Sequence, residues 1–435
     1  MKIQEPAFHK IYTIFVALIA SSIVLRMPCT ILLICFLVFN LVYVKRLQFS
    51  KPAVVLIAVV ALPFLLEVLF FWNNSSVSKG LKAAEKTVSM LFLPVFIIGN
   101  YRYINLKKIL FYFSRTIVIL LLLLVVRFVV VYPDYVTKYL NGIDLFEVGY
   151  FFSDTFKSHA PALNMHLAFA GIINFYFTLN SFTEKKNVLS KLTGFFFLAA
   201  NIGVVFLVGT RVALLNMLAG FAIISLGDFI KSKNKARLLK MGLATTVVFT
   251  ILSALYIKYN PYVIYKYKTE LFMNMDKVGR LDELEHPEYE AYGGLVTRLS
   301  IWKSALNVAS ENLPFGTGSS DGKPKLMEYY LKTGQYFLHE YHMPVHNQYL
   351  DFFMRFGIIG AIAVLAHILL PGFIGFKLKH PVIICFFMLF FISNLTDDFL
   401  IRFDGIVFSA VWCSIFSAYW LQQKLLTANK APVSP

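Results

Sequence analysis

Long apolar runs, separated by short polar breaks, extend over almost the whole chain. A helix needs roughly 20 apolar residues to cross the hydrocarbon core of a bilayer, and most of these runs approach that length. The pattern therefore predicts an all-α polytopic membrane protein with about twelve transmembrane helices. The predicted spans are residues 11–26, 30–45, 52–72, 87–101, 108–132, 159–180, 192–208, 211–230, 239–258, 343–370, 379–396 and 404–422.

One polar stretch, residues 259–342, is much longer than the other breaks and lies between the ninth and tenth predicted spans. It divides the chain into spans one to nine (1–258), the loop itself, and spans ten to twelve with a short cytoplasmic tail (343–435). Apolar residues recur at helical spacing from 295 to 309, which predicts an amphipathic helix near the membrane surface that ends before Pro314. We therefore expect a large, partly helical loop that carries much of the function.

Composition narrows the class of protein. The 435 residues are 58% hydrophobic and only 15% charged, which excludes an ordinary soluble enzyme and leaves the lipid bilayer as the expected surroundings. The net charge of +17 could indicate nucleic-acid binding, but Lys and Arg lie mostly in the short breaks, so no nucleic-acid partner is expected. Three of the four cysteines fall within predicted spans, Cys29 lies just before the second span, and none shows metal-type spacing, so neither a disulfide framework nor a zinc site is expected. They are Cys29, Cys35, Cys385 and Cys413.

The distribution of Lys and Arg among the breaks predicts the orientation of the chain. The two ends and the even-numbered breaks, for example around Lys107 and Lys186, carry more of these residues than the opposite short loops. By the positive-inside rule, both termini are expected in the cytoplasm and the loop 259–342 on the outer face. The first apolar run leads directly into the next without a small-residue cleavage site, so no cleavable signal peptide is expected.

Two arginines on the expected outer face are candidates for binding an anion. Arg211 follows a tight turn between two spans, and Arg298 lies near the start of the predicted amphipathic helix. Each has a plainer interpretation, because Arg211 could extend to the headgroup level and Arg298 could be a solvated charge. Gly316 and Gly318 could form a backbone turn that holds an anion, although two glycines are a weak signal.

His346 lies at the outer mouth of the tenth span and is followed by Asn347. A lone histidine at a helix start more often caps the helix than acts as a base, so both roles are considered. Asp351 and Arg355 follow at i, i+4 spacing, which suits a local ion pair. His286 has acidic neighbours but lacks ligands at metal-type spacing, and it does not support a metal site.

In this order, these stretches resemble the signatures of the O-antigen ligase and polymerase superfamily of bacterial inner-membrane glycosyltransferases. The Gly-Ser-Arg signature corresponds to residues 209–215, with Thr210 in place of serine. The Arg-x-x-x-Trp signature with a later Pro-x-Gly-x-Gly corresponds to Arg298, Trp302, Pro314, Gly316 and Gly318. The His-Asn-x-x-Leu signature with a later Gly-Ile-x-Gly corresponds to His346, Asn347, Leu350, Gly357, Ile358 and Gly360. The resemblance covers about residues 200–370 and reaches the first 190 residues only through hydropathy.

The resemblance implies a GT-C-like, multi-pass inner-membrane enzyme whose active site faces the periplasm. It implies transfer of a glycan from undecaprenyl pyrophosphate to an acceptor hydroxyl, with inversion at the anomeric carbon. Arg211 and Arg298 would bind the donor pyrophosphate, because a guanidinium forms a charged fork that suits phosphate oxygens. His346 would be the general base, since a neutral imidazole is available near neutral pH. Neither a metal nor a cofactor is expected in this scheme.

Further residues are candidates for supporting roles. Asn347, Trp302, Gly316 and Gly318 belong to the matched signatures. Charges within or beside predicted spans usually form pairs or line a cavity, so Glu67, Arg127, Asp397 and Asp398 are also considered. Arg127 is expected to face the donor cavity, and Asp397 or Asp398 is expected to orient an arginine, although nothing in the sequence identifies that arginine.

Four activities remain compatible with the sequence. An O-antigen ligase, which transfers glycan to lipid A core, is favoured because the chain has twelve predicted spans with one dominant loop between the ninth and tenth. An O-antigen polymerase and a protein O-oligosaccharyltransferase of the same superfamily are the alternatives. A lipid-linked-glycan flippase is the alternative from another class, but it should distribute its cations through the helix centres and show repeated halves.

Overall fold

The computed structural model is helical throughout its described part, which comprises residues 4–141, 147–184, 186–231 and 273–428, with residues 250, 251, 254 and 258. The first helices are α1 (Glu5–Ser22), α2 (Arg26–Val42), α3 (Lys51–Val60), α4 (Leu62–Leu69), α5 (Val77–Thr87), α6 (Ser89–Gly99), α7 (Leu106–Val131), α8 (Pro133–Leu140) and α9 (Glu147–Asp154). The later helices are α10 (Ala160–Thr183), α11 (Val188–Val208), α12 (Arg211–Lys231), α15 (Pro287–Glu290), α16 (Leu295–Glu311), α17 (Gly322–Lys332), α18 (Tyr336–Glu340), α19 (Gln348–Leu378), α20 (Pro381–Thr396) and α21 (Phe403–Ala428). An all-α fold is confirmed.

Several helices are suited to a bilayer by length and composition. Within the described ranges, five of them could cross a membrane unaided: α7, α10, α11, α19 and α21. Shorter apolar helices lie at Arg26–Val42, Arg211–Gly227 and Pro381–Thr396. This pattern is that of a polytopic membrane protein, and the described residues do not confirm the expected count of twelve spans. The predicted span 239–258 lies almost entirely outside the described residues.

The predicted span 52–72 is broken in two. Helices α3 and α4 meet at Ala61 with a bend of 70°, so the pair counts as one broken span or a re-entrant segment. Pro63 lies in the first turn of α4 and has no N–H to donate to the preceding turn, which explains why one helix ends and another begins here. The bend places Glu67, a buried carboxylate, on the short second helix.

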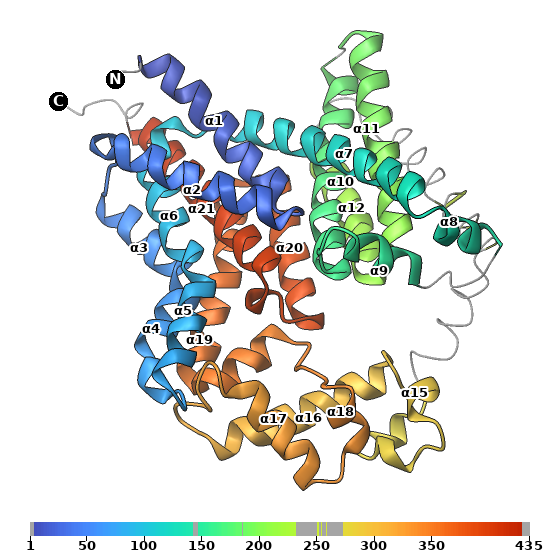
Figure 1. The fold of residues 1–435 in the computed structure, drawn as a ribbon. Helices are drawn as coiled ribbons and strands as arrows, with labels where there is room; N and C mark the ends of the chain where they lie inside the picture. The colour runs from blue at the N-terminus through green and yellow to red at the C-terminus, as the bar shows by residue number, and fades with distance from the viewer. Residues whose placement is uncertain are drawn as a thin grey trace.

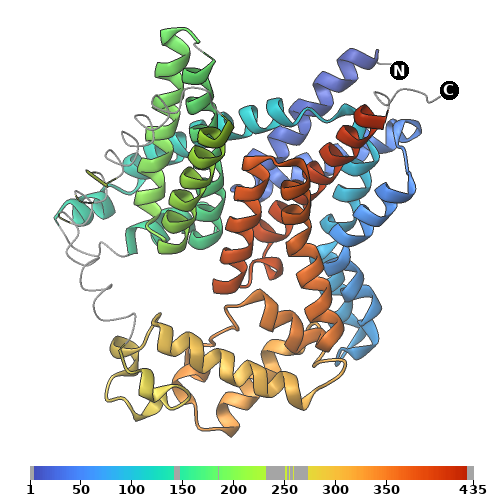
Figure 2. The ribbon, with the colours of Figure 1, turned by 180° about the vertical axis from the view of Figure 1, so that it is seen from behind.

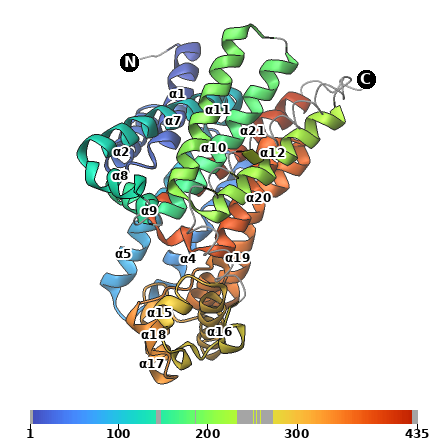
Figure 3. The same ribbon diagram turned by 90° about the vertical axis from the view of Figure 1, so that its right-hand side faces the viewer.

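Helices α15 to α18 form a layer at one end of the molecule, beneath the long helices, while α1 begins and α21 ends near the opposite end (Figures 1 and 2). This layer has a hydrophobic core of its own, to which Val296, Leu326 and Leu338 contribute from different helices. Met354 of α19 completes that core, so α19 connects the layer to the long helices (Figure 3). The predicted helix before Pro314 is confirmed as α16.

Helix α19 is kinked at Gly357, whose φ of 63° and ψ of −148° are outside the range of other residues. The segment after α16 packs onto this kink. The amide of Gly318 donates to the carbonyl of Arg355, and the amide of Ile358 donates to the carbonyl of Pro314, at 3.0 and 3.2 Å. These bonds use backbone groups that the kink releases from the helix. The kink at Gly357 thus allows the loop layer to pack against α19.

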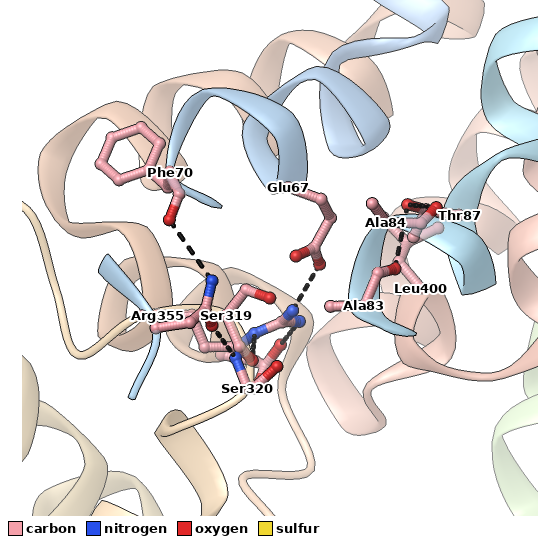
Figure 4. Close-up of polar contacts among 12 residues, drawn as sticks. Glu67, Phe70, Ala83, Ala84, Thr87, Ser319, Ser320, Arg355 and Leu400 are labelled. Atoms are coloured by element: carbon pink, nitrogen blue, oxygen red, sulfur yellow. Dashed lines mark hydrogen bonds and ion pairs between the residues drawn. The ribbon is translucent and has the colours of Figure 1, made fainter. Parts of the chain in front are cut away.

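Arg355, just before the kink, lies at the centre of a buried polar network (Figure 4). Its Nη2 donates to Glu67 at 2.6 Å, its Nη1 donates to Asp351 at 3.1 Å, and its Nε donates to the carbonyl of Ser319 at 2.8 Å. The predicted i, i+4 pair of Asp351 and Arg355 is therefore present. Glu67 and Ser319 extend it, so that α4, α19 and the loop are held together at one point.

Candidate active site

His346 and Asp397 face each other where the loop layer meets the long helices. His346 lies two residues before the start of α19, and Asp397 directly follows α20. The Nδ1 atom of His346 lies 3.2 Å from Oδ1 of Asp397, and the histidine side chain is 27% exposed. A carboxylate at this distance favours the tautomer with its proton on Nδ1, which leaves the lone pair on Nε2. The pair has the arrangement of a base held by a carboxylate.

The residues after His346 hold it in place. The side-chain oxygen of Asn347 accepts hydrogen bonds from the amides of Tyr349 and Leu350, at 3.0 and 3.1 Å, and so caps α19. The side-chain oxygen of Gln348 accepts from the amide of Leu400 at 2.6 Å. Because Leu400 closely follows Asp397, this bond keeps the two segments of the pair together. Asn347 therefore has a positioning role, and the capping role considered for His346 belongs to its neighbour.

Asp397 also faces a second histidine, His159, which the sequence did not suggest. His159 directly precedes α10, and its Nδ1 lies 3.7 Å from Oδ2 of Asp397. Burial lowers the pKa of His159 to about 4, and the charge of Arg402 acts in the same direction. His159 is therefore neutral at neutral pH. The one signal in the sequence was its position at the outer end of a predicted span, as for His346.

Asp397 and Asp398 carry different charges despite their adjacency. Burial opposes ionisation of Asp397, but its hydrogen bonds with His346 and Asp398 hold its pKa well below the usual range. Burial, the hydrogen bond with Asp397 and the charge of Asp397 raise the pKa of Asp398 well above the usual range. One carboxylate and one carboxylic acid result, as for other close acid pairs. The partner of Asp397 at hydrogen-bond distance is His346, whereas arginines act on the two acids through their charge, Arg298 near Asp397 and Arg402 near Asp398.

A metal ion is the other occupant to consider here. One ligand atom each from His346, Asp397 and Asp398 lie within 4.8 Å of one another, close enough for a cation. However, the buried Asp398 favours its neutral form, and a protonated carboxyl is a poor metal ligand. A divalent ion that bound this set would therefore have to displace the proton of Asp398.

Arg298 reaches the same place from the loop layer. It lies in the first turn of α16, and its Nη1 donates to the carbonyl of Thr396, the last residue of α20. Burial lowers the pKa of Arg298, while the charge of Asp397 raises it. A guanidinium remains charged under these conditions. The structure thus places a cation beside the segment that carries Asp397.

Arg211 begins α12 at a tight turn, as expected. Gly209 ends α11 with a φ of 70°, and the hydroxyl of Thr210 accepts a hydrogen bond from the side chain of Asn164 at 2.6 Å. The charge of Arg211 acts on Arg298 and on Tyr150. The replacement of serine by threonine therefore keeps the turn intact, and both arginines belong to one electrostatic environment.

Tyr150 on α9 is a further residue of this environment that the sequence did not suggest. Burial raises the pKa of Tyr150, the charge of Asp397 adds to the effect, and Arg298 and Arg211 oppose it. The residue remains 44% exposed. A half-exposed phenol beside two arginines is suited to contact a polar ligand.

Three supporting candidates lie differently from the expectation. The amides of Gly316 and Gly318 donate to the carbonyls of Asn312 and Arg355, so this turn holds the kink of α19 rather than presenting free N–H groups to an anion. Arg127 has an exposed side chain on α7, and its guanidinium lies 6.0 Å from the ring of Tyr132. The anion-holding role of the glycines is not supported by this geometry, and the contact shown for Arg127 is outside the group around Asp397.

Trp302 lies one turn after Arg298 on α16 and is half-buried. Its indole packs against the hydrophobic core of the loop layer, and its buried Nε1 has no hydrogen-bond partner among the described residues. The packing of Trp302 holds α16 against that core. Trp302 therefore supports the site through the placement of Arg298.

Comparison with known proteins supports a family. Residues 195–365 match the family model described as O-antigen ligase, whereas no curated protein matches the chain. The matched region includes Arg211, Arg298 and His346, and it leaves out His159 and Asp397. Members of this family are glycosyltransferase-like enzymes of O-antigen ligase or polymerase type that work in a membrane on lipid-linked glycans. The match over residues 195–365 supports the resemblance to the O-antigen ligase and polymerase superfamily.

Proposed function

We propose that the protein transfers a glycan from undecaprenyl pyrophosphate to a hydroxyl group of lipid A core, at the periplasmic face of the bacterial inner membrane. The observation that carries the proposal is the pairing of His346 with Asp397 beside Arg298, within a chain that resembles the O-antigen ligase superfamily. A base that is held by a carboxylate suits activation of an alcohol. A nearby guanidinium suits a pyrophosphate leaving group.

His346 acts as the general base in this proposal. Its Nε2 takes the proton of the acceptor hydroxyl, while Asp397 stabilises the imidazolium that forms. An alcohol is far less acidic than imidazolium, so the proton moves late, as the new bond develops. The ionised state of Asp397 supports this role, since its charge stabilises the protonated histidine.

Arg298 and Arg211 bind the pyrophosphate in this proposal. Negative charge grows on the bridging oxygen as the bond to the sugar breaks, and guanidinium groups lower the energy of that state. Arg298 is partly withdrawn from water, which strengthens its interaction with an anion. Tyr150 offers a hydroxyl to the same region and is assigned to ligand contact.

The reaction is a single displacement. The acceptor oxygen forms a bond to the anomeric carbon as the bond from that carbon to the pyrophosphate oxygen breaks. The electron pair leaves with undecaprenyl pyrophosphate, and the acceptor proton moves to Nε2 of His346. Attack opposite to the leaving group inverts the anomeric carbon. The arginines neutralise the leaving group, so we expect chelators to leave the rate unchanged.

Glycan transfer by purified protein tests the proposal. Wild type, His346→Ala and the control His286→Ala, which changes an exposed loop histidine, receive undecaprenyl-pyrophosphate-linked glycan with and without chelator. Separate reactions supply core lipopolysaccharide, a second lipid-linked repeat unit, or an acceptor peptide. Transfer to the core by wild type and the control, but not by His346→Ala, is the expected result.

The other outcomes are equally specific. Transfer to a repeat unit or to the peptide would reassign the acceptor, and loss of transfer on chelation would overturn the metal-independent step. Activity of His346→Ala equal to that of wild type would overturn the base. Detergent-purified protein has no membrane that separates two compartments, so absence of transfer with every acceptor would instead favour the flippase.

A further inference from the structure

A second polar site lies between α7, α10 and α11, at the end of the molecule opposite the candidate active site. Its lining comes from the beginnings of α7 and α11 and the end of α10, including Phe111, Phe177 and Ser190. His159 and Arg211, by contrast, mark the other ends of α10 and α11. Two adjoining cavities of about 340 and 320 Å³ share Phe111, Arg115 and Ser190. Together they form a cationic crevice.

Arg115 is the central group of the cationic crevice. Its Nε and Nη1 atoms are buried and make no hydrogen bond within the described part of the chain. The guanidinium lies 4.4 Å from the ring of Phe197 and 5.4 Å from that of Phe111, so its flat faces are covered by aromatic rings. Buried donors without acceptors are costly. An anion in the crevice would supply the missing acceptors.

The surrounding charges favour an anion as well. Lys107, Lys108 and Lys186 line the crevice together with Arg115. Glu184 is the acid near this rim, at 3.9 Å from Lys107 and 3.1 Å from Lys186, and its side chain is 47% exposed. One exposed carboxylate leaves most of the positive charge uncompensated, and the crevice is net cationic.

The outer surface next to the crevice is apolar. Leu189 and Phe197 line its wall, and α11 continues with Leu192, Phe195 and Phe196, all of which are exposed. On a helix that is long and apolar enough to span a membrane, such a surface faces acyl chains. An occupant that has an anionic head and an apolar tail therefore fits better than a small soluble anion.

We propose that the cationic crevice binds the phosphodiester headgroup of an anionic phospholipid, with its acyl chains against α11. Arg115 offers two N–H groups to the phosphate, and the three lysines attract its charge. The positive-inside rule assigns this end to the cytoplasmic leaflet, where basic pockets between membrane helices bind anionic headgroups. The site would anchor the α7, α10 and α11 group to that leaflet.

Lipid retention by the purified full-length chain tests the proposal. Native mass spectrometry compares binding of phosphatidylglycerol and phosphatidylcholine by wild type, Arg115→Gln and the control Lys51→Gln, which removes an exposed cation assigned to the same membrane face. We expect wild type and the control to retain phosphatidylglycerol preferentially, and Arg115→Gln to bind it about tenfold more weakly. The double variant Lys108→Gln/Lys186→Gln changes exposed side chains only and should also bind more weakly.

The contrary outcomes are distinct. Equal phosphatidylglycerol binding by wild type, Arg115→Gln and the double variant would overturn the site, as would equal binding of phosphatidylcholine. Inorganic phosphate is added in a third arm. If phosphate alone occupied the crevice and no lipid were retained, the lipid assignment would be overturned in favour of a soluble phosphate compound. If Arg115→Gln failed to fold, the double variant would decide the result.

Discussion

Arg355 and Glu67 form a buried ion pair at 2.6 Å although 288 positions separate them in the chain. Arg355 lies directly before the kink of α19, and Glu67 lies on the short helix that follows the break at Ala61. The pair therefore joins two irregular points of the membrane domain. The carbonyl of Ser319, which also accepts from Arg355, adds the loop to this junction.

Removal of one partner of this junction should be strongly destabilising. Arg355→Met leaves Glu67 and Asp351 buried without a cation, which typically costs about 3–5 kcal/mol of the free energy of unfolding. The double variant Glu67→Leu/Arg355→Met removes one of the two acids and should recover part of the loss. Thermal unfolding in detergent checks this. A double variant no more stable than Arg355→Met would contradict the role of Glu67 as the partner.

Gly357→Ala should prevent residues 314–318 of the loop from packing against the kink of α19. The backbone conformation of Gly357 alone costs any other residue on the order of 1–3 kcal/mol. A Cβ atom at this position would also overlap the carbonyl oxygen of Pro314. We expect a lower unfolding temperature and increased proteolysis of residues 273–342. Gly203→Ala is the matched control, because a Cβ atom there meets open space; equal effects of the two changes would contradict the prediction.

Asp397→Asn should lower kcat more than it raises the donor KM. The amide cannot stabilise the imidazolium of His346, so a loss within the 10²- to 10⁴-fold range typical of general-base catalysis is expected, at about 10² or more. Donor binding depends mainly on the arginines and should change little. Steady-state transfer kinetics measure the two parameters separately. Asp276→Asn, which changes an exposed loop acid, should match wild type; an unchanged kcat for Asp397→Asn would disprove the prediction.

His159 should make the protein less stable at mildly acidic pH. Its pKa is about 4 in the folded chain and 6.5 in an unfolded one, so the unfolded state binds more protons between these values. The free energy of unfolding should therefore fall as the pH drops from 6.5 towards 4, and His159 should contribute nothing above this window.

Unfolding temperatures at pH 7.5 and pH 5 measure the effect of His159. The decrease should be smaller for His159→Gln than for wild type, whereas His286→Gln, at an exposed position, should behave as wild type does. If wild type and His159→Gln showed the same decrease, the low pKa of His159 would be refuted.

Arg298→Lys should weaken donor binding although the charge is kept. Lysine lacks the planar fork and cannot both donate to the carbonyl of Thr396 and grip a pyrophosphate in the same way. We expect the donor KM to rise about tenfold, which corresponds to 1.4 kcal/mol, and kcat to fall as well. Transfer assays at varied donor concentration give both values. Lys303→Gln on the same helix is the control, and a wild-type donor KM for Arg298→Lys would argue against this assignment.

Much of the fold was accessible from hydropathy. Every predicted span within the described ranges overlaps at least one helix, and α16 forms where helical spacing predicted it. The break at Ala61 and the kink at Gly357 were not foreseen, because an apolar run looks the same whether its helix is straight or bent. Pro63 was a visible signal for the first, whereas the second depends on the docking of residues 314–318.

The candidate site was accessible only in part. His346, Arg298 and Arg211 were identified because they lie in short motifs at the ends of predicted elements. The roles of Asp397 and His159 were not, because each depends on which helix ends come together in space. Asp397 was considered as a partner for an arginine, yet packing places it against two histidines.

The sequence by itself determined where the helices lie and which motif residues are candidates for the active site, because hydrophobic runs and short signatures are local properties of a chain. The tertiary structure alone decided the pairs His346–Asp397 and Arg355–Glu67. It also left the buried Nε and Nη1 donors of Arg115 without a hydrogen-bond acceptor among the described residues. These features join residues from separate helices, and their energies arise only when packing removes the groups from water and brings them within a few ångströms.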